Sequence, residues 1–148
     1  MGADPKGSLV RRKKAAYNAI DYNAEVRIKA SDIDRRAIEA ARENAIEAGV
    51  EDCIEFSVSD ANKLTAREEY GIIITNPPYG QRIGEQTQLD IIYKNLKRFM
   101  KDNPTWSEFI ITADKTFESK IGRKADRRRK LYNGRIETCF YQYHGAKR

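Results

Sequence analysis

The stretch IIITNPPYG, from Ile72 to Gly80, constrains the fold more than any other part of the sequence. Three consecutive isoleucines are typical of a buried strand in a parallel sheet. Pro77 and Pro78 cannot donate hydrogen bonds within a sheet, so the strand must end before them. In an open α/β sheet, ligands bind beside the loops that follow the carboxyl ends of strands. The loop that begins at Asn76 is therefore a candidate binding site.

Predicted strands and helices alternate along the rest of the chain. Besides the isoleucine strand, apolar alternation predicts strands within residues 25–34, 52–61 and 107–115. Helical spacing predicts helices within residues 8–23, 34–49 and 88–104, and residues 116–130 are predicted as a basic helix or a broken helix. In the second of these helices, Asp34 is the expected N-cap and Gly49 the expected stop.

The end of the chain predicts a β-hairpin, because Asn133-Gly134 lies between two β-rich arms. Alternating strands and helices predict an α/β fold with a mostly parallel sheet, to which the hairpin adds an antiparallel edge. We expect residues 1–25 to form a basic N-terminal segment and residues 26–148 to form the remaining domain. A chain of 148 residues is long enough for one domain with a core and too short to expect two compact units.

Composition narrows the function less than the motifs do. Lys and Arg number 28 against 22 Asp and Glu, which gives a net charge of +6. This balance favours a polyanionic partner, although proteins without one often share it, and charge alone leaves both interpretations open. No apolar run is as long as a membrane span and no signal peptide is evident, so we expect a soluble cytoplasmic protein with no membrane partner.

The cysteines and the single histidine do not predict a metal site. Cys53, Cys139 and His144 share no ligand spacing, which leaves no support for zinc or for a Cys-His nucleophile. We expect both cysteines to be ordinary buried or half-buried thiols.

Three strand exits carry polar residues that can meet in one crevice. Asp32, Asp60 and Asn76 each follow a predicted strand, and the carboxyl ends of parallel strands lie at the same rim of a sheet. Taken singly, an aspartate at the position of Asp32 is more often a helix cap, and Asp60 is a common turn residue. A ligand site is indicated only by all three residues together, one at the exit of each successive strand.

The Asn-Pro-Pro-Tyr loop has the chemistry to hold a planar amine. Asn76 precedes a proline and is held extended, while the prolines fix the backbone. The Asn76 amide oxygen and the Pro77 carbonyl can each accept a hydrogen from an NH₂ group and orient its nitrogen. Tyr79 offers a face on which a base can stack, with a contribution on the order of 1–3 kcal/mol. An ordinary proline-rich turn is the competing interpretation.

This constellation resembles the Asn-Pro-Pro-Tyr motif of S-adenosylmethionine-dependent methyltransferases that modify nitrogen in a planar system. The resemblance implies that Asp32 binds the ribose hydroxyls of the cofactor and that Asp60 lies beside its adenine. The implied catalytic residues are Asn76, Pro77, Pro78 and Tyr79. The implied cofactor-binding residues are Asp32, Ile33, Asp60, Ala61 and Asn76.

A longer match over about residues 26–145 narrows the resemblance. The segments SDIDRRAIEAARENAIEAG, NPPYGQRIG and KLYNGRIETCFYQY are similar to the catalytic domain of THUMP-associated ribosomal RNA guanine-N2 methyltransferases. This family implies a Rossmann-like class I methyltransferase fold and ribosomal RNA as partner. Adenine-N6 methylation of DNA or RNA and protein-glutamine methylation remain alternatives, as does a non-catalytic RNA-binding module. The oligomeric state is not predicted.

One part of the family pattern is missing. Family members begin this domain with a first strand and a glycine-rich loop around the cofactor, whereas ADPKGS at residues 3–8 is at most a faint echo. Because the first strand is central, its absence predicts a gap in the sheet with unpaired edges on both sides. Either the chain is a piece of a longer enzyme, which we favour, or its N-terminal segment closes the gap. We expect weak or absent cofactor affinity.

A basic cluster precedes the predicted hairpin. Its residues are Arg123, Lys124, Arg127, Arg128, Arg129 and Lys130. As a helix, it would either contact RNA phosphates or form a solvated face, and the sequence favours neither. A separate set of aromatic residues is predicted to lie in the core or on a sheet face: Tyr93, Tyr132, Phe140, Tyr141 and Tyr143.

Overall fold

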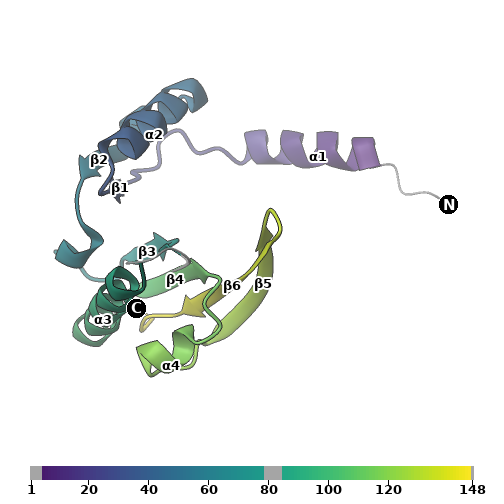
Figure 1. Ribbon diagram of the computed structural model, residues 1–148. Coiled ribbons are helices and arrows are strands. Elements are labelled where there is room, and N and C mark those ends of the chain that lie inside the picture. Colours follow the sequence, from purple (N-terminus) through teal and green to yellow (C-terminus); the bar gives the residue numbers. More distant parts are fainter. Residues whose placement is uncertain (1–4, 79–84, 148) are drawn as a thin grey trace. The chain divides into compact units, whose positions relative to one another are not determined.

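The computed structural model describes residues 5–78 and 85–147, shown in Figure 1. Its helices are α1 (Pro5–Asn18), α2 (Arg35–Ala48), α3 (Glu85–Asp102) and α4 (Phe117–Ile121), with short 3-10 turns η1 (Glu51–Cys53) and η2 (Ala61–Lys63). Its strands are β1 (Ile28–Asp32), β2 (Ile54–Val58), β3 (Ile72–Thr75), β4 (Ser107–Thr112), β5 (Arg127–Asn133) and β6 (Ile136–Tyr143). The predicted order of elements is confirmed, apart from the basic helix discussed below.

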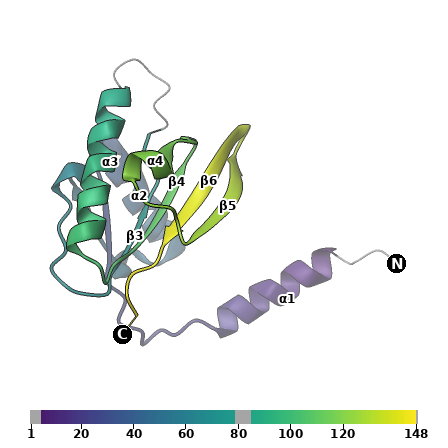
Figure 2. The same cartoon turned by 90° about the horizontal axis from the view of Figure 1, so that it is seen from below.

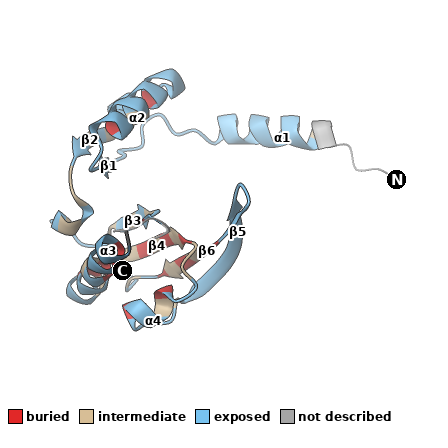
Figure 3. Cartoon of the chain, viewed as in Figure 1, coloured by how far each residue is buried: buried red, intermediate tan, exposed pale blue. Residues whose placement is uncertain are grey.

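The chain divides into two compact units, whereas its length predicts a single one. One contains Met1–Ala30 and Arg36–Ser57, and the other contains Ser31–Arg35 and Val58–Arg148. In the first unit α2 begins after Asp34 and ends at Gly49, whose φ of 66° is the left-handed conformation that glycine adopts without strain. Both predicted ends of this helix are therefore confirmed. Helix α1 is exposed along its described side chains (Figure 3) and ends five residues before the limit predicted for it.

Four strands form the sheet of the second unit, in the order β3-β4-β6-β5. β3 and β4 are parallel, with Thr75 beside Ile110, whereas β6 pairs antiparallel with both β4 and β5. The predicted parallel sheet with an antiparallel hairpin is confirmed. The hairpin loop lies one residue later than expected, because Asn133 pairs with Ile136 and the loop is formed by Gly134 and Arg135. Gly134 has a φ of 60°, as the first loop position of such hairpins requires.

The core of this unit lies between the sheet and the two helices α3 and α4, which lie in front of the strands in Figure 2. Phe117 of α4 is fully buried and contacts the rings of both Tyr93 on α3 and Tyr141 on β6, each at 4.9 Å between centroids. The cluster consists of Leu89, Tyr93, Leu96, Ile110, Phe117, Ile121, Tyr141 and Tyr143. Both helices therefore cover the same face of the sheet.

Alternation along β4 divides the sheet residues between its two faces. Glu108, Ile110 and Thr112 are buried towards the helices, whereas Phe109 and Ile111 are half-buried on the opposite face. Figure 3 shows this burial concentrated in the centre of the sheet. Edge strands β3 and β5 are far more open, and every residue of β5 is exposed.

Among the described residues, the strands lie in two separate sheets, and β3 is an unpaired edge of the larger one. β1 and β2 form a separate two-stranded sheet, and no strand among residues 5–78 and 85–147 joins it to β3. β3 therefore ends the second sheet, where Ile72 and Ile74 are 64% and 74% exposed. The N-terminal segment forms a helix instead of a closing strand. Within the described residues, no helix has the length and apolar character needed to cross a bilayer.

Several sequence predictions are wrong in detail. Residues 116–130 do not form one basic helix, because α4 stops at Ile121, where Gly122 takes a left-handed φ of 75°. Cys53 is exposed and not a buried thiol, although Cys139 is half-buried as expected. By contrast, the aromatic residues predicted as core or sheet face are found there: four are buried or half-buried, and Tyr132 lies on β5, where it is 64% exposed.

Candidate functional site

The first two predicted site aspartates lie side by side at strand exits. Asp32 is the last residue of β1, and its carbonyl accepts a hydrogen bond from Ser59 N at 2.9 Å, just beyond the end of β2. The carboxyl ends of β1 and β2 are therefore adjacent. Asp60 follows Ser59 directly, so the structure brings together the two residues that the resemblance assigns to the cofactor ribose and adenine.

Both aspartates use one carboxylate oxygen to shape the local backbone. Asp32 Oδ1 accepts from Asp34 N at 2.8 Å, and Asp60 Oδ1 accepts from Asn62 N at 2.8 Å, which caps η2. These are the cap and turn roles that compete with a ligand role. Among the described residues, Oδ2 of each has no hydrogen-bond partner, so each retains an acceptor for a hydroxyl or an amine. Ile33 is 70% exposed beside Asp32.

The turn at Asp60 is fixed to the helix that follows the proline loop. Asn95 on α3 donates through Nδ2 to Asn62 Oδ1 at 2.7 Å and to Ile91 O at 3.0 Å. Through this contact, Asp60 and Ala61 are held against α3. Sequence reasoning did not identify Asn62 or Asn95, whose pairing across 33 residues leaves no local pattern.

The proline corner lies at the exit of β3. Asn76 and Pro78 are exposed, whereas Pro77 between them is buried and anchors the turn. No side-chain hydrogen bond of Asn76 is formed within the described residues, which leaves its amide available to a ligand. Tyr79 lies outside the described residues, so its predicted stacking role stays a prediction. No hydrogen bond joins Asn76 to Asp32 or Asp60 among the described residues, and their common crevice also stays a prediction.

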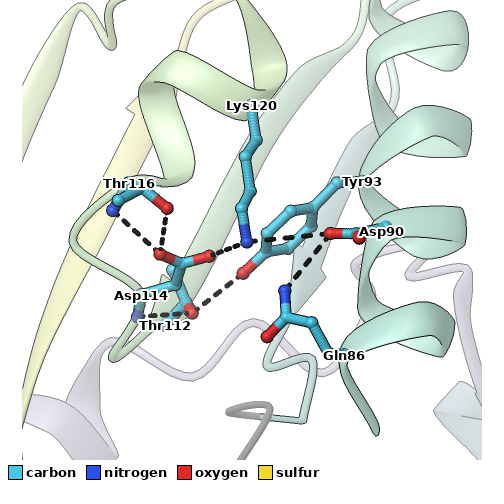
Figure 4. Close-up of polar contacts among 7 residues, drawn as sticks. All are labelled: Gln86, Asp90, Tyr93, Thr112, Asp114, Thr116 and Lys120. Atoms are coloured by element: carbon cyan, nitrogen blue, oxygen red, sulfur yellow. Dashed lines mark hydrogen bonds and ion pairs between the residues drawn. The ribbon is translucent and has the colours of Figure 1, made fainter. Parts of the chain in front are cut away.

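A polar network that the sequence analysis missed lies at the exit of β4 (Figure 4). Asp114 Oδ1 accepts from Thr116 N at 2.8 Å and from Thr116 Oγ1 at 2.6 Å, while Oδ2 accepts from Lys120 Nζ at 3.0 Å. Partial burial acts to raise the pKa of Asp114, but these hydrogen bonds outweigh it and the pKa lies below its ordinary value. A polar residue at a strand exit is the signal that identified Asp32, and it applies equally to Asp114.

This network connects α4 and β4 to the first half of α3. Lys120 Nζ lies 3.7 Å from Asp90 Oδ1, and Tyr93 forms a hydrogen bond of 3.2 Å with Thr112 Oγ1. Gln86 Nε2 donates to Asp90 at 3.3 Å. Burial raises the pKa of Tyr93 to about 12, so its hydroxyl stays protonated at physiological pH. The start of α3, which follows the proline loop in sequence, is thereby held in place.

A cavity of about 140 Å³ opens near the same strand exit, away from the predicted cofactor residues. Its lining includes the half-buried thiol of Cys139. The residues are Thr112, Ala113, Asp114, Lys115, Lys130, Glu137, Thr138, Cys139 and Tyr141. Asp32, Asp60 and Asn76 do not contribute to it. Among the described residues, no group of His, Cys, Asp or Glu side chains is arranged to hold a metal ion.

The six predicted nucleic-acid-binding residues lie on a loop and on strand β5 instead of on a helix. Arg123 and Lys124 follow α4, and Arg127 to Lys130 form the first half of β5. All six are exposed. A strand directs successive side chains to opposite faces, so the cluster does not form the single basic surface that a helix face would present.

Comparison with known proteins identifies the family. The family model described as the RMKL-like methyltransferase domain matches residues 3–142. The chain belongs to this family. The match extends further towards the N-terminus than the resemblance seen in the sequence, and it confirms the predicted kinship with ribosomal RNA methyltransferases.

Individual relatives support the same assignment. "Putative RNA methyltransferase YpsC" of Bacillus subtilis is 42% identical over 123 residues, which are 83% of this chain and 32% of the relative. "Ribosomal RNA large subunit methyltransferase K/L" of Shewanella baltica is 37% identical over 136 residues, 91% of this chain and 19% of the relative. The crystal structure of SMU.472 complexed with SAH is 36% identical, with a TM-score of 0.80 over 98% of this chain and 38% of that one.

These comparisons confirm the predicted methyltransferase fold of this RMKL-like domain. They also show that the chain spans about a third or less of the length of the curated relatives it matches. The activity, substrate and partners of a whole protein therefore do not follow from the match alone.

Proposed function

We propose that this RMKL-like domain takes part in S-adenosylmethionine-dependent methyl transfer to the exocyclic amine of a base in ribosomal RNA, with guanine N2 favoured. The observation that carries the proposal is the exposed Asn76 amide, directly after a strand and anchored by buried Pro77. The relatives support it by their names, which include ribosomal RNA methyltransferases. The predicted cytoplasmic location belongs to the same proposal.

The residues at the rim fit the expected cofactor. Asp32 and Asp60 each keep one carboxylate oxygen without a partner among the described residues, and adjacent strand exits bring the two close together. These oxygens suit the ribose hydroxyls and the adenine amine of S-adenosylmethionine, with Ile33 and Ala61 beside them. When bound, the cofactor supplies an electrophilic methyl group on a sulfonium.

Asn76 and Pro77 orient the accepting amine. The Asn76 amide oxygen and the Pro77 carbonyl oxygen each accept one hydrogen of the amine, which directs the nitrogen lone pair away from the ring. Pro78 keeps the corner rigid, and Tyr79 stacks on the base after it leaves its helix or loop. No strong base is required, because the methylated nitrogen can release its proton to water afterwards.

The proposal is tested with a chimera in which the 123 matched residues of this chain replace the corresponding region of the Bacillus subtilis relative. We expect the chimera to transfer labelled methyl groups from S-adenosylmethionine to ribosomal RNA, and nucleoside analysis to recover N2-methylguanosine. Recovery of label in adenine or in glutamine would favour one of the alternatives instead. A folded chimera that methylates none of these substrates would contradict the proposal.

Cofactor affinity of the unmodified chain is a separate measurement. We expect weak or absent binding of S-adenosylmethionine, because β1 and β3 belong to separate sheets and the described residues contain no strand that pairs with β3 on its open side. Calorimetric titration that gives micromolar binding would show that this expectation is wrong.

A further inference from the structure

The basic cluster of β5 is divided by the alternation of its strand. Arg128 forms an ion pair with Glu118 of α4 at 3.2 Å, so its side chain points to the face that carries the helices. Lys130, two residues further, shares this face and pairs with Glu137 at 2.7 Å. Arg127 and Arg129 must therefore point to the opposite face. No carboxylate within residues 5–78 and 85–147 forms an ion pair with either arginine.

A cation that is already paired with a carboxylate attracts a distant anion less strongly than an unpaired cation does. Hydrogen bonding to Glu137 raises the pKa of Lys130, which fixes its charge beside a carboxylate of opposite sign. The field of a paired cation is largely cancelled at the distance of a bound polyanion. The positive charges of Arg127 and Arg129 are not offset by any carboxylate that the structure describes. The same holds for Lys124 in the preceding loop, which also has no ion pair among the described residues.

Aromatic side chains accompany the two unpaired arginines. In the strand register, Arg129 lies opposite Phe140, and Arg127 lies opposite Gln142, which in turn lies opposite Phe109. Side chains opposite each other in an antiparallel pair share a face. The rings of Phe109 and Phe140 are stacked, 5.9 Å apart with an angle of 27° between their planes. Both residues are half-buried, and the Phe109 ring also meets the ring of His144 edge-on, at 5.7 Å between centroids.

We propose that this face binds single-stranded RNA, with Arg127 and Arg129 on phosphates and the Phe109 and Phe140 pair beneath a base. We name this surface the open face and define it by Arg127, Arg129, Phe140, Gln142 and Phe109. The proposal rests on RNA being the substrate, as proposed above. The unpaired arginines lie on an edge β-strand, and the aromatic rings lie one or two β-strands further in, at about 5 Å per strand. This arrangement matches single-stranded RNA, in which a charged phosphate backbone runs beside flat bases.

The experiment compares two double variants that remove the same charge from the same strand. Arg127→Gln with Arg129→Gln changes the open face, and Arg128→Gln with Lys130→Gln changes the helix-covered face. Affinity of the full chain for a short labelled single-stranded RNA is measured by fluorescence anisotropy over a range of potassium chloride concentrations. Thermal unfolding of each variant checks that the fold is retained.

We expect the open-face variant to reduce the slope of log affinity against log salt by about 1.4, or about 0.7 for each lost phosphate contact. The matched variant, with the same net charge, should change the slope by less than half as much. Equal changes in both variants would overturn the assignment to the open face. Absence of RNA binding by the unchanged protein would also overturn it.

Stacking has a separate readout. Phe140→Leu keeps an apolar side chain but removes the ring, and we expect at least a fivefold loss of affinity at every salt concentration with an unchanged slope. Unchanged affinity would remove the aromatic pair from the proposal. Methyl transfer by the chimera is independent of these results, so failure of the open face and failure of the proposed function can be told apart.

Discussion

Glu108 gives the sharpest test of how the second sheet is packed. Its side chain is 1% exposed on β4, and neither carboxylate oxygen has a hydrogen-bond partner among the described residues. Burial raises the pKa of Glu108 to about 8, and the charge of Arg123 opposes this only in part. At neutral pH the group is therefore mostly protonated in the folded chain. We expect the neutral substitution Glu108→Gln to stabilise the protein increasingly as pH rises.

The magnitude follows from proton linkage. The ordinary pKa of 4.5 applies to the unfolded chain, so below pH 4.5 both states are protonated and the group has no effect on stability. Between pH 4.5 and 8 only the folded chain keeps its proton, and stability falls by about 1.4 kcal/mol per pH unit. At pH 7 the free energy of unfolding is therefore lower than below pH 4.5 by roughly 3 kcal/mol, and above pH 8 this loss no longer grows.

Urea unfolding at pH 5, 7 and 8.5 measures the difference in unfolding free energy between the protein and Glu108→Gln. The contributions of all other titrating groups are the same in both and cancel in this difference. We expect Glu108→Gln to be close to the unchanged protein at pH 5 and more stable by roughly 2–3 kcal/mol at pH 7. Glu47→Gln on exposed α2 is the matched control and should show no such trend. Parallel stability profiles for the protein and Glu108→Gln would refute the reasoning.

Three further predictions follow from single positions. Gly71→Ala should destabilise the fold by at least about 2 kcal/mol in urea unfolding, since an added Cβ would lie 2.3 Å from the Trp106 ring. Ile74→Lys should reduce concentration-dependent association in sedimentation, because a charge protects an open apolar edge; unchanged association would argue against the edge as its cause. Asp114→Asn should weaken the loss of stability in acid, since the lowered pKa of Asp114 contributes stability above its ordinary 3.8 that disappears as pH falls; an unchanged acid transition would contradict this.

The parts of the fold with local signals were predictable. Helix α2 has a capping position at Asp34 and a glycine stop at Gly49, and both mark its ends in the structure. The isoleucine run and the prolines after it fixed the end of β3. The separation of β1 and β2 from the larger sheet was also foreseeable, because a named part of the family pattern is missing from the sequence.

The parts decided by tertiary contacts were not predictable. Residues 127–130 have the composition of a basic helix, but pairing with β6 makes them a strand. Glu108 lies in an apolar strand pattern that gives no indication of an unpaired buried carboxyl group. Among the candidate site residues, Asp32 and Asp60 were identified correctly as neighbours at strand exits, whereas the contacts of Asn62 and Lys120 depend on residues far away in sequence.

The role of Asn76 in orienting the amine is the central claim, and single-turnover methyl transfer in the chimera tests it most directly. We expect Asn76→Ala to slow transfer to ribosomal RNA on the order of a hundredfold, because one preorganised hydrogen bond to the reacting group is lost. The dissociation constant for S-adenosylmethionine should change by less than a factor of about three, since Asp32 and Asp60 are intact. An unchanged transfer rate in a folded Asn76→Ala chimera would contradict the account.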